Sequence, residues 1–142
     1  MFLLDTDHLG IMQARTHPEV DRLRARMGEH SPEEFYVSIV SFHEQVLGWN
    51  AYIQRAKALA GVVRGYRRFQ GILADFAAMQ VLSFDLAAAE VFESLRERRV
   101  RVSTMDLRIA ATALSRGFGV LTRNKVDFAR VPGLQIEDWT VA

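Results

Sequence analysis

Short runs of apolar residues alternate along the chain with longer stretches in which apolar positions recur every three or four residues. Short runs of this kind are typical of buried strands, and the three-to-four spacing is typical of amphipathic helices. We expect strands at residues 2–4, 35–37, 81–82, 119–121 and 134–136. We expect helices over about 6–14, 18–28, 40–57, 61–78, 85–98, 103–116 and 125–128.

The same spacing places apolar residues on one face of three expected helices, and in the last of them, 85–98, this face is expected to point inward. These positions are Phe42, Val46, Trp49 and Ile53 in the helix from residue 40; Val62, Phe69, Leu73 and Phe76 over 61–78; and Leu86, Val91, Phe92 and Leu95 over 85–98. Gly65 and Gly71 weaken the helix propensity in the middle of 61–78, and Gly117 is the expected end of 103–116. The apolar side of 61–78 serves either the core or a dimer contact.

Strands that alternate with helices need crossover connections, and these produce a parallel sheet covered by helices on both faces. No internal repeat and no linker-like segment interrupts the 142 residues. We therefore expect an α/β fold of three layers, α/β/α, around a central parallel sheet of about five short strands. Residues 1–142 are expected to form a single domain.

The composition narrows the class of protein. A hydrophobic fraction of 49% and a charged fraction of 25% exclude a disordered or low-complexity chain. The absence of cysteine excludes disulfides, thiolate nucleophiles and sulfur-based zinc sites, and it fits a reducing compartment. Asp5 interrupts the apolar start, and no apolar run approaches the ~20 residues of a membrane span, so we expect a soluble cytoplasmic protein without a signal peptide.

The formal net charge of +1 conceals a strong preference for arginine. Only Lys57 and Lys125 are lysines among the 18 basic residues. The arginines gather at residues 55–68 and 96–101. Two interpretations remain open, a solvated helix face and a surface for nucleic acid.

Four acidic residues lie close to the expected ends of strands or the starts of helices: Asp5, Glu44, Asp106 and Asp127. Ligands of an open parallel sheet bind at the carboxyl ends of its strands, so these four side chains are candidates for one site. The alternative is helix capping, since Asp5 suits an N-cap and three pairs have capping-box spacing: Ser41 and Glu44, Ser103 and Asp106, and Asn124 and Asp127. Four gathered carboxylates would repel one another by about 1–4 kcal/mol per close pair, which a divalent cation relieves.

Carboxylates and water are the ligands that Mg²⁺ and Mn²⁺ prefer, and the water positions that such an ion keeps suit hydrolysis of a phosphodiester. A zinc site is disfavoured because the histidines show no metal-ligand spacing: His8, His17, His30 and His43.

Four segments occur in the order and spacing of a known family: FLLDTDHL at 2–9, SIVSFHEQ at 38–45, TMDLRIAA at 104–111 and LTRNKVDF at 121–128, followed by VPGL at 131–134. In these segments, over nearly the whole length, the chain resembles the PIN-domain family, and in particular the VapC-type toxins of bacterial toxin–antitoxin pairs.

The resemblance implies a PIN-like fold and an endoribonuclease that depends on Mg²⁺ or Mn²⁺. It also implies a VapB-type antitoxin, encoded beside the toxin, that keeps it inactive, and a homodimer. Asp5, Glu44 and Asp106 match the first three acids of the family and would bind the metal. Members commonly carry an acid directly after Thr-Arg, where this chain has Asn124; Asp127 takes the fourth catalytic position, or the site uses three acids.

Further residues near these motifs are candidates for supporting roles: Asp7, Thr104, Thr122, Asn124, Arg108 and Arg123. Asp7 would make an outer contact to the metal or only favour a helix start, the threonines would hydrogen-bond carboxylates or metal-bound water, and the arginines would meet RNA phosphate or neutralise the acids. His8 and His43 are interpreted as core or surface residues, and Trp49 and Trp139 as core or interface residues.

Two other functions compete with the ribonuclease. Asp5-Thr6-Asp7 after a strand resembles the nucleophile motif of haloacid-dehalogenase-type phosphatases, although Leu9 departs from that pattern. A PIN module that only binds partners is the other alternative, because Asn124 replaces an acid.

Overall fold

The computed structural model describes residues 1–15 and 18–142, and the structural statements below concern these residues. Its strands are β1 (Phe2–Leu4), β2 (Phe35–Ser38), β3 (Val81–Leu82), β4 (Gly119–Leu121) and β5 (Ile136–Glu137). They form a five-stranded sheet in the order β3-β2-β1-β4-β5, with every pair parallel. β1 therefore lies at the centre of the sheet, between β2 and β4.

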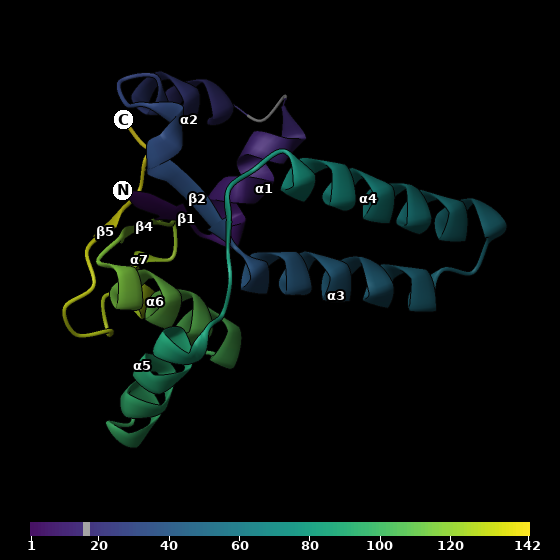
Figure 1. Ribbon diagram of the computed structural model, residues 1–142. Coiled ribbons are helices and arrows are strands. Elements are labelled where there is room, and N and C mark those ends of the chain that lie inside the picture. The colour runs from purple at the N-terminus through teal and green to yellow at the C-terminus, as the bar shows by residue number, and fades with distance from the viewer. Residues whose placement is uncertain (16–17) are drawn as a thin grey trace.

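The helices are α1 (Thr6–Ala14), α2 (Val20–Met27), α3 (Ile39–Arg55), α4 (Leu59–Ala77), α5 (Leu86–Glu97), α6 (Thr104–Arg116) and α7 (Lys125–Phe128), with a 3₁₀ turn at Pro32–Glu34. In Figure 1, α1 and α2 lie on one side of the sheet, and α5 and α6 lie on the other. The α/β fold with a parallel sheet between helical layers is confirmed.

Successive residues of β1 explain the two layers, because neighbouring side chains of a strand point to opposite faces. Leu3 belongs to the cluster that packs against α5 and α6 and includes Ile109. Leu4 belongs to the other cluster, which includes Leu9 of α1 and Leu23 of α2. One three-residue strand thus anchors both halves of the core.

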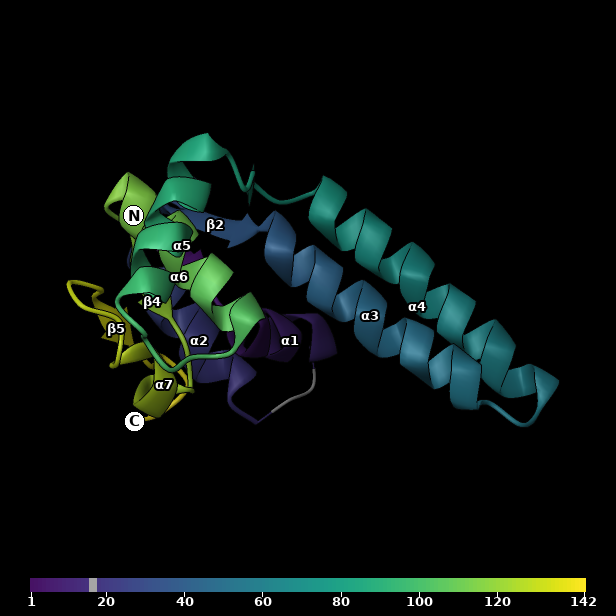
Figure 2. The same cartoon turned by 90° about the horizontal axis from the view of Figure 1, so that it is seen from below.

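Helices α3 and α4 form an antiparallel hairpin that extends away from the sheet (Figures 1 and 2). We call residues 39–77 of this hairpin the arm. A Cβ atom at Gly65 would lie 2.2 Å from Cγ1 of Ile53, so the missing side chain lets the helices approach closely. The helix predicted over 61–78 therefore forms in spite of its glycines, and Gly65 allows α4 to pack closely against α3.

Most expected elements agree with the structure to within a few residues, but several details were wrong. The last strand is Ile136–Glu137 rather than 134–136, and the helix expected from residue 18 begins at Val20. Leu86, predicted to face inward, is 74% exposed, and Leu73, for which a core role and a dimer contact were both open, is 65% exposed and lies outside the core. Thr16 and His17 lie outside the described residues. In the part of the chain that the structure describes, no helix is long and apolar enough to cross a membrane.

Candidate active site

Asp5 stands directly after β1 and is 4% exposed. Its Oδ1 accepts a hydrogen bond of 2.8 Å from the Thr6 backbone N–H and so caps α1. Its Oδ2 accepts another of 2.8 Å from the hydroxyl of Thr122, which follows the neighbouring strand β4. The parallel register of β1 and β4 continues beyond the strands, since the Asp5 N–H donates to the Leu121 carbonyl at 2.9 Å. Asp5 therefore caps a helix and also lies at the edge where ligands of parallel sheets bind.

Asp7 lies in the first turn of α1 and reaches the same turn after β4. Its Oδ2 accepts hydrogen bonds from the backbone N–H of Arg123 at 3.0 Å and from the Thr122 hydroxyl at 3.3 Å. Its Oδ1 lies 2.9 Å from Nδ1 of His8, a fully buried residue. The other ring nitrogen of His8, Nε2, accepts from the backbone N–H of Trp139 at 3.1 Å. His8 is thus a core residue that holds Asp7 to the C-terminal segment.

Glu44 extends from α3 towards the start of α1. Its Oε1 accepts a 2.8 Å hydrogen bond from the hydroxyl of Thr6, whose oxygen also lies 3.0 Å from Oγ of Ser41. The predicted capping role of Ser41 and Glu44 is wrong, because Ser38 caps α3 by accepting from the Val40 N–H at 3.0 Å. The side chain of Glu44, from α3, therefore lies at the carboxyl end of β1, beside Thr6.

Asp106 lies in the first turn of α6, which Ser103 caps by accepting from the Asp106 N–H at 3.4 Å. The side-chain amide of Asn124 lies 3.5 Å from Oδ2 of Asp106 and donates to Oδ2 of Asp127 at 3.0 Å. Asn124 occupies the N-cap position of α7 without a side-chain capping bond. Its amide instead links the third and fourth predicted acids. Asp127 also pairs with Arg130 at 3.4 Å.

The pKa values of the three principal acids are all raised. Burial, with the charges of Asp7 and Asp106, raises the pKa of Asp5 to about 7. Burial also raises the pKa of Glu44, helped by Asp106 and Asp7. The pKa of Asp106 rises through burial, and Asp127 and Asp7 add to the effect. The acids therefore lie near enough to repel one another, which capping alone does not explain.

Asp5, Glu44 and Asp106 form no ion pair with a lysine or arginine of residues 1–15 and 18–142. Within the same residues, no three Asp, Glu or His side chains converge as a ready-made metal cage. Mg²⁺ usually takes one or two carboxylates and keeps several waters, so its site does not require such a cage. The oxygen-only donors and the uncompensated negative charge fit a hydrated hard cation.

The side chains of three supporting candidates make no hydrogen bond or ion pair with the site acids in the described chain. Arg108 packs over the Phe92 ring at 5.5 Å, and in the described chain none of its polar contacts is to an acid of the site. The side chain of Arg123 pairs with Glu19 at 2.8 Å, and only its backbone contacts the site. Thr104 is exposed at the start of α6.

Sequence reasoning missed one functional residue, Thr6. Its hydroxyl connects the start of α1 with Glu44, a partner 38 positions away. Its place between Asp5 and Asp7 was the available signal, because a polar side chain between two site acids lies near the same edge.

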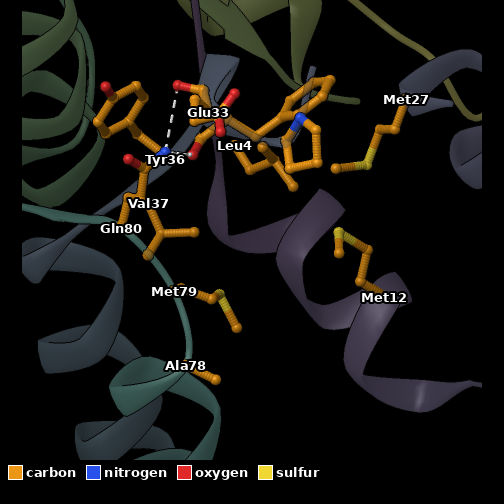
Figure 3. Close-up of a pocket in the computed structure, with 11 residues that line it drawn as sticks. Leu4, Met12, Met27, Glu33, Tyr36, Val37, Ala78, Met79 and Gln80 are labelled. Atoms are coloured by element: carbon orange, nitrogen blue, oxygen red, sulfur yellow. Dashed lines mark hydrogen bonds between the residues drawn. The ribbon is translucent and has the colours of Figure 1, made fainter. Parts of the chain in front are cut away.

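None of the site acids lines an apolar pocket with a volume of about 340 Å³ (Figure 3). Leu4, Met12, Met27 and Met79 line it, together with residues of β2. It holds no pair of convergent acids, and its walls suit an apolar segment of a partner better than an ionic substrate.

Comparisons with known proteins identify the family of the chain. The PIN domain family model matches residues 2–134. The tRNA(fMet)-specific endonuclease VapC of Salmonella typhimurium is 30% identical over 97% of both chains, and the protein of the same name from Shigella flexneri is 29% identical over 98% of both. The crystal structure of DNA-bound VapBC from Salmonella typhimurium superposes with a TM-score of 0.74, at 27% identity over 97% of both chains. The chain belongs to the PIN-domain family.

Proposed function

We propose that this protein is a VapC-type toxin, an endoribonuclease that depends on Mg²⁺ or Mn²⁺ and is neutralised by a VapB-type antitoxin. One observation carries the proposal: Asp5, Glu44 and Asp106 come from three distant segments, are held at one sheet edge and form no ion pair with a lysine or arginine of the described residues. A phosphodiesterase that uses a divalent cation needs carboxylates of this kind to bind it.

Asp5, Glu44 and Asp106 would hold the metal ion. The bound ion would supply a water of lowered pKa and stabilise negative charge on the phosphate. Thr122 and Thr6 fix the carboxylates of Asp5 and Glu44 through their hydroxyl donors, each at 2.8 Å.

Asp127 is proposed as the fourth catalytic residue, which positions the attacking water. The amide of Asn124 donates to Oδ2 of Asp127 at 3.0 Å, and Oδ1 pairs with the half-exposed Arg130 at 3.4 Å, so the attacking water would have to compete with Arg130 for Oδ1. Asp7 orders the turn after β4 and adds negative charge beside Asp5.

The initiator tRNA is the first substrate to test, because two relatives carry tRNA(fMet)-specific endonuclease in their names. The raised pKa values have a functional consequence here. Each carboxylate is costly to ionise without a cation, so metal binding and ionisation of the cluster are coupled.

The decisive experiment is RNA cleavage in the presence and absence of Mg²⁺ by the unaltered protein and by Asp5→Asn and Asp106→Asn. Both variants should lose about 100-fold or more in cleavage rate while retaining the fold, since asparagine also caps helices. Asp21→Asn is the matched control, because Asp21 is exposed on α2. Undiminished cleavage by both site variants would remove the metal-site proposal.

Calorimetric titration with Mn²⁺ distinguishes the enzyme from a PIN module that only binds partners. The unaltered protein should bind Mn²⁺, and Asp106→Asn should bind it at least about tenfold more weakly. A folded protein without measurable Mn²⁺ binding would favour the inactive module.

The antitoxin is proposed as the partner on the basis of the VapBC relatives, and the apolar pocket beside Met12 and Met79 offers a surface for one of its segments. Light scattering of the chain alone, and with the product of the adjacent open reading frame, measures both the proposed homodimer and this complex.

A further inference from the structure

The arm carries an unusual distribution of charge. No Asp or Glu occurs from residue 45 to residue 74, and five basic residues do. They are Arg55, Lys57, Arg64, Arg67 and Arg68, and all five are exposed. The other arginine-rich segment differs, because Arg96 pairs there with Glu93 at 3.2 Å. The arm therefore presents net positive charge that its own acids do not balance.

These cations also lack acidic partners elsewhere in the described chain. None of the five forms an ion pair with an acid of residues 1–15 or 18–142. Arg68 lies over the Trp49 ring at 5.2 Å, which orients it across the cleft between the two helices. Arg64 and Arg67 are three positions apart on α4, a spacing at which like charges destabilise a helix. An anionic partner would relieve this repulsion.

The register of the hairpin gives the distance from the arm cations to the acids. Gly65 lies against Ile53, and Phe42 packs on Phe76 with ring centroids 5.3 Å apart. This antiparallel register places Arg64 level with residue 54, ten positions beyond Glu44, or about 15 Å along the helix axis. A cleft of about 310 Å³ lies between α1 and the arm, and it is lined by Gln13, Gln45, Trp49, Arg68 and Asp75.

We propose that the arm is an extended binding surface for the phosphate backbone of the RNA substrate, with Arg64 and Arg67 as phosphate contacts about 10–15 Å along the arm axis from the level of Glu44. This inference rests on the proposed ribonuclease function. Arginine forks bind phosphate bidentately, and contacts at this distance hold the flanking RNA while a phosphodiester lies at the acids.

A protein partner is the rival occupant of the arm. Exposed apolar residues do run along another side of α4: Leu59, Val63, Tyr66 and Leu73. Their spacing of four, three and seven keeps them on one stripe, and Arg64 and Arg67 lie outside it. A second copy of the chain would bring like charges towards one another at the arginines, whereas RNA would neutralise them.

The test compares the unaltered protein with Arg64→Gln/Arg67→Gln and with a control of equal charge change, Arg24→Gln/Arg98→Gln. All four arginines are exposed. Cleavage of a transfer RNA is followed for KM and kcat, and RNA affinity is measured against salt in an Asp106→Asn background. The arm variant should raise KM about tenfold near 0.15 M salt and reduce the slope of log affinity against log salt by about 1.5, with the control unaffected.

An unchanged KM and salt slope would overturn the arm proposal while leaving the nuclease intact. So would a fall in kcat alone, or a change of mass in light scattering without a change in KM, since the latter marks a protein interface. Failure of the unaltered chain to bind or cleave RNA would instead overturn the proposed function itself. If the Arg64→Gln/Arg67→Gln variant unfolds at a lower temperature than the unaltered protein, Arg55→Gln/Lys57→Gln repeats the test at the tip of the hairpin, where Arg55 ends α3 and Lys57 lies in the connection to α4.

Discussion

The edge of the sheet that holds Asp5, Glu44 and Asp106, here called the acid edge, differs from the arm in the sign, burial and hydrogen bonding of its charged groups. At the edge, Asp5 is 4% exposed, hydrogen-bonded on both carboxylate oxygens and surrounded by other acids. On the arm, Arg64 and Arg67 are exposed and have no ion pair with a described residue. The edge concentrates charge where the proposed metal ion would require a fixed geometry, and the arm spreads charge where the proposed RNA contact tolerates movement.

This difference also separates the rate of the reaction, set at the edge, from the affinity for the substrate, set on the arm. A buried carboxylate is ordered by its donors, so small displacements change the chemistry. An exposed arginine makes long-range, salt-dependent contacts with phosphate and tolerates movement. Variants at the edge should therefore act on the rate and on metal binding, and variants on the arm on substrate affinity.

The largest expected effect concerns metal-free stability at the edge. The pKa of Asp5 is about 7 in the folded protein against 3.8 as the ordinary value. A raised folded-state pKa contributes stability that is present below about pH 4 and lost as pH rises through 7, here up to about 4 kcal/mol. Urea unfolding in EDTA should therefore show stability falling between pH 4 and 7.5, and Mg²⁺ should restore it at pH 7.5.

Asp5→Asn should abolish most of this fall and make the metal-free protein more stable at pH 7.5, whereas exposed Asp21→Asn should leave it in place. The pKa values of Glu44 and Asp106 are also raised and act in the same direction. A metal-free protein whose stability rises over this interval would contradict the edge as described.

Thr122→Val should produce the next largest effect. It removes the hydroxyl that donates to Asp5 at 2.8 Å and leaves the volume nearly unchanged. Loss of a group that orients a metal ligand typically costs 10–100-fold in affinity or activity, so kcat should fall by about that factor. Thr112→Val is the control, since the Thr112 hydroxyl donates to the Arg108 carbonyl within α6. Equal losses in both variants would deny Thr122 its orienting role.

Gly65→Ala should have the smallest effect and acts on the arm alone. The added Cβ would overlap Ile53 and cost about 1–3 kcal/mol, offset by up to about 1 kcal/mol of better helix propensity. We expect a net loss of about 1 kcal/mol in urea unfolding, with a higher KM for RNA. Gly71→Ala, where nothing lies within 4 Å of the new Cβ, should be neutral or stabilising. A stabilised Gly65→Ala would show that the helices do not approach as closely as described.

Local patterns in the sequence determined the order and type of the elements. The run at 2–4, the cap at Ser103 and the glycine at 117 act within a few residues, so they were visible without the fold. Buried strands alternating with helices also implied a parallel sheet. The placement of Asp5, Glu44, Asp106 and Asp127 at expected strand ends and helix starts made them candidates for one site, and the motif resemblance assigned the metal to the first three.

Only the tertiary structure showed which side chains hold one another. The same three-residue spacing produced a cap at Ser103, a link between acids at Asn124 and no cap at Ser41. Thr6 meets Glu44, and Thr122 meets Asp5, across 38 and 117 positions. Sheet register and helix placement set such contacts, and both depend on the packing of the whole core, so neither can be inferred from the residues on either side of them.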